Sequence, residues 1–376
     1  MKIESISKYL RGFAITGVVV ENYFSFIPVN SSSSLVSSII IYVSFLGASF
    51  VHIFFFLSGY GLARKYSDSE SFNWKKYAIN RFSMIAIPYW IVVITTYLFI
   101  NILHGQNPKI FEASHSLSDL LSNIVFLRNF YESARELNPT LWFIPVVVGL
   151  YMAFPFLLYL MKKHGLKALL LISALIAYSS RFVYWTYGYE PARESSIFLF
   201  YIFEFAVGMA FAGIPDSKQI SLRIGSINII YFLVTILGYA ISYILKMRIG
   251  IGANLHEVFT YAGSVALGIL SYQLVAYLKL GILEKSLHSI GSVAFILYLI
   301  HAPPIQHVIR PILEKYYNNS QGIITVFSIL IAYFALITLV SKALAKYSKA
   351  LSINIERNMK TRFGLMPVQH HSIKEI

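Results

Sequence analysis

Several polar side chains stand inside apolar stretches of this sequence, and their types suit proton transfer. Glu21 and Asn22 interrupt the run "LRGFAITGVVVENYF", and later apolar runs hold His52, Glu204 and His301. A histidine or a carboxylate can act as a general base, whereas an amide only makes hydrogen bonds. An ionisable group inside a membrane helix costs at least about 2.5–3.5 kcal/mol on insertion scales. These residues are therefore candidates for a catalytic site.

The depths of these residues point to one level in a membrane. Counted at 1.5 Å per residue from the predicted cytoplasmic helix ends, Asn22 lies about 21 Å deep and His301 about 19 Å deep. His52 and Glu204, on helices of the opposite direction, lie about 15 Å deep. We therefore expect four helices to meet at a common cavity.

Each residue also has a structural explanation. His301 can hydrogen-bond within a helix that its neighbouring prolines bend, and His52 can bond a backbone carbonyl of the next helix. Glu204 can be a paired carboxylate, and Glu21 can face the headgroups. Polar pairs between membrane helices contribute only about 0.6–2 kcal/mol each. A purely structural role for all of these residues at once is therefore less well supported than such a role for any one of them.

Arg11 lies on the same helix face as Asn22. A separation of eleven positions makes about three turns, which places the side chains about 16 Å apart along the axis. Arg11 then sits at the predicted cytoplasmic headgroup level. Two roles fit this position: snorkelling to lipid phosphate, and clamping the phosphates of a substrate whose reactive end reaches Asn22.

The composition requires membrane helices to position these residues. Of 376 residues 57% are hydrophobic and 13% are charged, well below the quarter that is usual in soluble proteins. The net charge of +14 comes from short basic clusters between apolar runs, which is typical of cytoplasmic loops and not of nucleic-acid binding. The absence of cysteine excludes thiol nucleophiles and thiolate metal ligands, and we expect no metal.

We predict an all-α integral membrane protein built from a bundle of about ten transmembrane helices. One transmembrane domain covers residues 1–350, and a short basic cytoplasmic tail covers 351–376. The predicted helices are 8–28, 36–62, 83–103, 141–161, 166–186, 196–214, 226–246, 255–279, 289–310 and 322–344.

The basic clusters alternate with more neutral loops, which predicts that both termini are cytoplasmic. The longest loop, about 104–140, then lies outside, and its mixed charges predict a folded segment. The clusters are Lys2, Lys8 and Arg11; Arg64, Lys65, Lys75, Lys76 and Arg81; Lys162, Lys163 and Lys167; Lys218 and Arg223; Lys279 and Lys285; and the tail from Lys342 to Arg362.

Several stretches, in order from residue 9 to residue 304, resemble the membrane acyltransferase-3 family. "YLRGFAITGVVVENYF" is similar to its first helix, which carries a basic residue, ten positions and then histidine. "FVHIFFFLSGYGL" is similar to its phenylalanine-rich helix and "NRFSMIAIPYW" to the start of its third helix. The remaining matches are "PTLWFIPVVVGLYMAFP", "EFAVGMAFA" and "AFILYLIHAPP".

The resemblance implies a multi-pass protein of the cell membrane, of bacterial type, that moves an acetyl or other short acyl group. The donor is cytoplasmic acetyl-CoA or another acyl-CoA, and the acceptor is a hydroxyl of a surface polysaccharide or a lipid-linked glycan. Other implied partners are membrane lipids and a polysaccharide synthesis or export machinery. Arg11, Arg81 and Lys76 would hold the CoA phosphates, with Ser58 and Tyr298 beside the acyl-carrying arm.

The sequence also departs from the family pattern. Asn22 stands where the family places its catalytic histidine, so the general base is missing there. His52 stands where many relatives carry aspartate or proline, and Met84 replaces a frequent arginine. Glu204 and His301 match the family's glutamate and late histidine.

Three readings of Asn22 remain open. The base has moved to His52, Glu21 or His301; or the chain is a degenerate member that binds or exports a glycan without transfer; or Asn22 is an engineered replacement of histidine. The leading hypothesis is acyl transfer, and the alternative is a non-catalytic glycan-binding or polysaccharide-export membrane protein.

Overall fold

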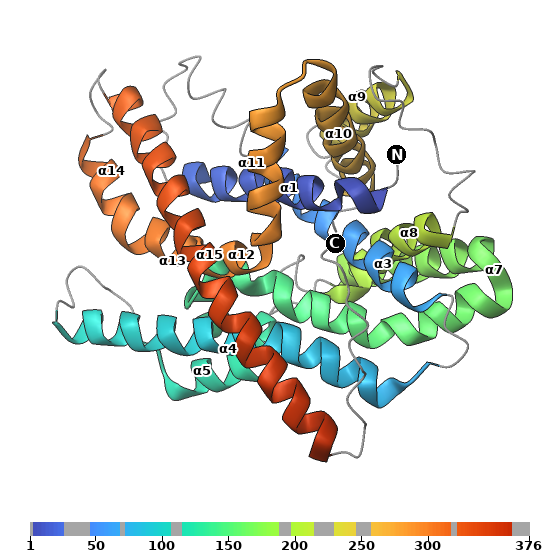
Figure 1. The fold of residues 1–376 in the computed structure, drawn as a ribbon, viewed down its shortest axis with the longest axis horizontal. Coiled ribbons are helices and arrows are strands. Elements are labelled where there is room, and N and C mark those ends of the chain that lie inside the picture. The colour runs from blue at the N-terminus through green and yellow to red at the C-terminus, as the bar shows by residue number, and fades with distance from the viewer. Residues whose placement is uncertain are drawn as a thin grey trace.

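The fold is an assembly of helices, seen in a computed structural model (Figure 1). The structure describes residues 3–25, 46–67, 72–106, 115–187, 197–213, 229–245, 257–316 and 322–362, and these contain no strand. The start of the predicted helix 36–62, the cluster of Lys218 and Arg223, and the tail beyond Arg362 lie outside these ranges.

The long helices follow the predicted apolar runs. The larger helices are α1 (Ile3–Ser25), α3 (Val51–Tyr66), α4 (Trp74–Gln106), α7 (Phe143–Tyr187), α8 (Ile202–Gly213), α9 (Ile229–Ile244), α10 (Glu257–Tyr277), α11 (Gly281–Ser292) and α15 (Gly322–Arg362). The short helices are α5 (Leu117–Ile124), α6 (Glu132–Glu136), α12 (Ala294–Ile300), α13 (Ala302–Pro304) and α14 (Arg310–Tyr316).

Within the described ranges, five helices are long and apolar enough to cross a membrane, and the bent pair Gly281–Ser292 and Ala294–Leu313 makes a sixth. The helix α1 is not among them, because its 23 residues include four charged side chains and Asn22. The fold is thus an all-α, membrane-type fold, while ten spans and cytoplasmic termini stay predictions.

The helix α7 is bent where the sequence divides two predicted helices. Gly165 has φ of 81° and ψ of 179°, values that a residue with a side chain adopts only under strain. The bend falls between the predicted helices 141–161 and 166–186. It marks the turn between two helices that otherwise run on as one.

The crossing of α1 and α11 fixes the helix that carries Arg11 (Figure 1). A Cβ atom on Gly12 would lie 1.9 Å from the carbonyl oxygen of Leu287, and one on Gly291 would lie 1.8 Å from that of Lys8. Small residues let membrane helices approach closely in this way. The contact holds α1 against the helix pair that leads to Tyr298.

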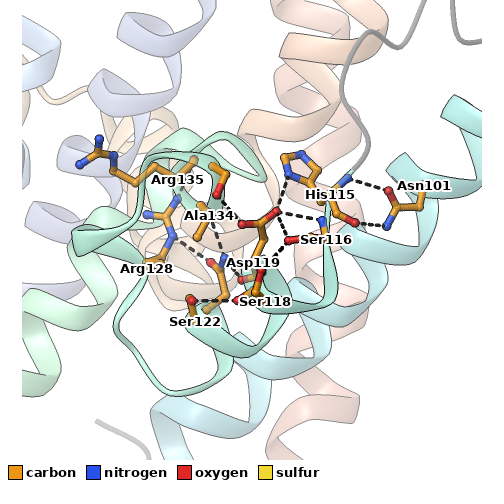
Figure 2. Close-up of polar contacts among 11 residues, drawn as sticks. Asn101, His115, Ser116, Ser118, Asp119, Ser122, Arg128, Ala134 and Arg135 are labelled. Atoms are coloured by element: carbon orange, nitrogen blue, oxygen red, sulfur yellow. Dashed lines mark hydrogen bonds and ion pairs between the residues drawn. The ribbon is translucent and has the colours of Figure 1, made fainter. Parts of the chain in front are cut away.

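The segment between α4 and α7 is folded in its described part, 115–142, as its mixed charges predict. Asp119 and Ser116 form a capping box at the start of α5, and Ser133 donates a hydrogen bond of 2.5 Å to Asp119. Figure 2 shows Asp119 at the centre of this network, with His115 directed toward it.

Arg128 closes the same segment from within. Its side chain is fully buried and donates from Nε to Asn123 at 2.8 Å. Its terminal nitrogen donates to the carbonyl oxygens of Arg135 at 2.8 Å and Asn138 at 2.7 Å. Arg128 therefore ties α5 and α6 to the start of α7.

Candidate functional site

A basic cavity opens beside the first turns of α1, and we call it the vestibule. Its volume is about 550 Å³, and its lining includes Lys8, Arg11, Arg64 and Lys65 with a single acidic residue, Glu4. Glu4 is 3.8 Å from Arg64, a pair that is about one-third exposed. The vestibule therefore carries a surplus of positive charge suited to phosphate groups.

A second cavity, the middle cavity, continues from the vestibule. The two share Arg11, Leu57 and Gly61 in their linings. The middle cavity has a volume of about 400 Å³ and is also lined by Ser58 and Arg81. With Tyr298, four residues predicted to bind acyl-CoA thus line one space.

A third cavity lies toward the other end of α1, and we call it the Asn22 cavity. It has a volume of about 310 Å³, is lined by Glu21 and Asn22, and shares Tyr298 with the middle cavity. The other wall comes from the segment between α4 and α7, through Glu132, Arg135, Glu136, Pro139, Thr140 and Trp142. The three cavities form a series along α1 with Arg11 at one joint and Tyr298 at the other.

The two adjacent residues of α1 differ in what they offer this cavity. Asn22 donates from Nδ2 to the carbonyl of Val18 at 3.0 Å, one turn back on its own helix. Glu21 makes no hydrogen bond or ion pair with another described residue and lines the cavity wall. Glu21 is therefore one of three carboxylates on the cavity wall, with Glu132 and Glu136, and it is the one next to Asn22 on α1.

His52 and Glu204 form a buried pair away from this series. Nδ1 of His52 is 2.8 Å from Oε2 of Glu204, and neither side chain lines any of the three cavities. A second pair, Arg181 and Glu257, is 3.0 Å apart. The predicted common cavity of four helices is therefore not found: His52 and Glu204 do not line the cavity that Asn22 lines.

His301 is fully buried beside the Asn22 cavity and does not line it. Its Nδ1 is 2.8 Å from the carbonyl of Tyr298, so this nitrogen carries the proton and donates it. Nε2 is then the basic nitrogen, and it has no hydrogen-bond partner within the described residues. The hydroxyl of Tyr333 bonds the carbonyl of His301, which fixes the helix at this point.

Tyr298 separates the middle cavity from the Asn22 cavity. Its hydroxyl donates to the carbonyl of Thr140, and its ring centroid is 5.7 Å from that of His301. The acceptor of this hydrogen bond belongs to the segment before α7. Tyr298 therefore joins α12 to the wall of the Asn22 cavity.

The predicted basic residues divide between the cavities and the surface. Arg81 lies over the ring of Tyr151 at 5.7 Å, and its Nε is buried without a hydrogen-bond partner among the described residues. Lys76, half-buried near the start of α4, lines none of the three cavities. Among the described residues, no group of three histidine or acidic side chains lies close enough together to hold a metal ion.

Sequence reasoning missed the part that α6 plays in the Asn22 cavity. Glu132, Arg135 and Glu136 line it, and they belong to the loop stretch "YESARE" rather than to an apolar run. Three charges within five residues, outside any predicted span, were the available signal. The vestibule likewise uses Lys8 and Lys65, which the sequence assigns only to orientation.

Comparison with known proteins gives one match. No curated protein and no solved structure matches the chain. The model of a family described as an acyltransferase domain matches residues 6–346, which include most of α1 and the lining of the three cavities except Glu4 and Ser5. The chain therefore belongs to the acyltransferase-3 family.

Proposed function

We propose that this protein is a membrane O-acyltransferase that moves an acetyl or other short acyl group from cytoplasmic acyl-CoA to a hydroxyl of a surface or exported polysaccharide. The observation that carries the proposal is the series of three cavities along α1, from the basic vestibule to the Asn22 cavity. Family membership supports an acyltransferase in general. The donor and the acceptor are parts of the proposal.

The vestibule suits the phosphates of CoA. Lys8, Arg11 and Lys65 lie around it on two helices, and guanidinium and ammonium groups are the usual partners of phosphate. Arg11 has no hydrogen bond or ion pair with a described residue, so its charge is available to a ligand. The acyl-carrying arm would then extend through the middle cavity past Ser58 and Arg81.

The reaction needs a base and a hydrogen-bond donor in the Asn22 cavity. We assign the base to Glu21, which removes the proton of the acceptor hydroxyl as its oxygen attacks the thioester carbonyl. The new C–O bond forms, the C–S bond breaks, and the CoA sulfur leaves and takes up a proton. The second hydrogen of the Asn22 amide can donate to the carbonyl oxygen, where negative charge develops.

A second candidate function is glycan binding or export without acyl transfer. The observation that favours it is Asn22 itself, because the amide cannot replace the family's histidine as a base. This candidate predicts movement or retention of a glycan with no consumption of acyl-CoA. This candidate function gives no role to the excess positive charge that lines the vestibule.

The test uses membranes that contain the protein, radiolabelled acetyl-CoA and surface polysaccharide from the host. We expect CoA release that depends on the polysaccharide, and a mass increase of one acetyl group on its sugars. Asn22→His tests the role of the amide in the same assay. Polysaccharide of unchanged mass, with or without the protein, would favour the non-catalytic candidate.

A further inference from the structure

In the segment 115–130, several apolar side chains are exposed and several polar side chains are buried. Leu117 is 62% exposed and Val125 is 55% exposed, whereas Asp119, Asn123 and Arg128 are buried. Leu117, Leu121 and Val125 follow one another at intervals of four residues, so they form one stripe along α5 and its end. A segment folded in water would place these polar residues outside and the leucines inside.

This segment runs beside α4 in the opposite direction. At its start, the amide of Asn101 exchanges two hydrogen bonds with the backbone of His115, at 3.1 and 2.9 Å. At its end, Nε1 of Trp90 donates to the carbonyl of Ile124 at 2.8 Å. Figure 1 shows α5 alongside α4 accordingly.

These hydrogen bonds to α4 show how far the segment 115–130 extends along α4. Trp90 and Asn101 are eleven residues apart on α4, which is about 16 Å along the helix axis. The membrane-capable part of α4 runs from Trp74 to Ile102, and Trp90 is close to its midpoint. Ile124 therefore lies near the middle of a span, well below the end of α4.

The exposed stripe is continuous with surfaces that a membrane must cover. On α4, Ile94 and Leu98 are exposed at the same levels as α5. Past Val125, Phe126 lines an apolar groove of about 220 Å³ together with Phe82 of α4 and Met152 of α7. One apolar surface thus joins the segment to two helices.

The buried polar side chains supply what such a position requires. Irregular backbone at membrane depth is tolerated where protein groups satisfy its hydrogen bonds. Asn123 donates to the carbonyl of Ala134, and Arg128 donates to the carbonyl of Arg135 (Figure 2). Arg128 also donates to the carbonyl of Asn138. The polar interior therefore replaces water for the turns between α5 and α7.

We propose that residues 115–130 form a re-entrant segment of the membrane domain, whose stripe of Leu117, Leu121 and Val125 contacts lipid acyl chains. The chain continues directly into Glu132 and Arg135, which line the Asn22 cavity. The bilayer then supports the outer wall of this cavity. The proposal does not depend on the reaction that the cavity performs.

The test exploits the absence of cysteine from the chain. Full-length Leu121→Cys is spin-labelled in liposomes, and its collision rates with oxygen and with a water-soluble nickel chelate are compared. Ile94→Cys is the lipid-facing control at the same level, and His164→Cys, exposed at the bend of α7, is the water control. Leu117→Cys and Val125→Cys extend the measurement along the stripe.

We expect the label at Leu121→Cys to prefer oxygen as strongly as the label at Ile94→Cys. The preference should increase from Leu117→Cys to Val125→Cys, since each step of four residues descends about 6 Å. A label at Leu121→Cys that collides with nickel as often as at His164→Cys would overturn the proposal. Exclusion of both reagents, with disulfide-linked dimers of Leu121→Cys on oxidation, would also overturn it by assigning the stripe to a second copy.

Discussion

At the scale of single residues, the chemistry depends on two neighbours of α1. Asn22 bonds its own helix backbone, and Glu21 faces the same cavity without a protein partner among the described residues. The proton-accepting role that the family gives to one position has, on this assignment, moved by one residue. Adjacent residues on a helix point about 100° apart, so both reach one cavity only because that cavity wraps around α1.

Replacing Glu21 by glutamine tests this assignment. Glu21→Gln keeps the shape and removes the base, so we expect kcat for acyl transfer to fall by roughly 10²- to 10⁴-fold with little change in KM for acyl-CoA. Steady-state CoA release measures both constants. His301→Gln is the matched control, because His301 does not line the cavity. A larger loss in His301→Gln than in Glu21→Gln would place the base on the histidine.

Arg11 and Lys76 separate cavity charge from surface charge. Arg11 lines both the vestibule and the middle cavity, whereas Lys76 lines neither. A charge-assisted hydrogen bond contributes about 1.5–3 kcal/mol, so Arg11→Gln should weaken binding of acyl-CoA by roughly 10- to 150-fold. Lys76→Gln should change the Kd by less than about 3-fold. Equal effects of the two substitutions, measured by equilibrium binding to purified protein, would contradict the assignment.

At the residue scale, the sequence predictions used the position along and around one helix at a time. The period of a helix predicts Arg11 and Asn22 on one face; in the structure Arg11 lines the vestibule and the middle cavity, and Asn22 lines the Asn22 cavity. Depth alone does not say which way a side chain points around its helix. His52 and Glu204 were therefore predicted at the level of Asn22 but face each other instead of its cavity.

At the scale of elements, the segment between α4 and α7 is the part that sequence reasoning described least well. The stretch "LSDLLSNI" folds as the amphipathic helix α5, but its pattern does not say whether water or lipid covers the apolar face. The burial of Asp119 and Asn123 shows that the polar face of α5 packs against the protein and that its apolar face points outward. Tertiary hydrogen bonds, which no local pattern encodes, decide the orientation.

Asp119→Asn tests the network that holds this element. Because the carboxylate accepts bonds from Ser116 and Ser133, its loss should destabilise the protein by about 1–3 kcal/mol at pH 7. Ser122→Ala, which removes only a bond to the carbonyl of Ser118, is the control and should change little. Thermal unfolding in detergent measures both variants.

The crossing of α1 and α11 can be tested at a single atom. A Cβ atom in Gly291→Ala would meet the carbonyl oxygen of Lys8 at 1.8 Å, so the two helices must move apart. We expect lower thermal stability and weaker acyl-CoA binding, because Arg11 moves with α1. Gly281→Ala introduces the same methyl group on α11 in open space and should behave as wild type within about 0.5 kcal/mol. Equal stability and equal acyl-CoA binding of Gly291→Ala and Gly281→Ala would contradict the prediction, because α1 and α11 could then move apart without effect.

At the scale of the whole molecule, composition and hydropathy predicted the helical membrane fold, and the family model extends over most of the chain. The predicted orientation places the vestibule on the cytoplasmic side, and the segment between α4 and α7 then enters the membrane from the outer side. On that basis the donor and the acceptor approach the cavity series from opposite faces of the membrane. The series of cavities is then the path that the acyl group takes.

The most direct test of this account is acyl transfer across a sealed membrane. The protein is reconstituted in liposomes with radiolabelled acetyl-CoA confined to the side of the vestibule and acceptor polysaccharide on the other side. The account predicts labelled polysaccharide on the far side, one CoA released for each acetyl group transferred, and loss of both in Arg11→Gln and Glu21→Gln. Polysaccharide that stays unlabelled across intact liposomes, while acetyl-CoA and polysaccharide on the same side react, would contradict it.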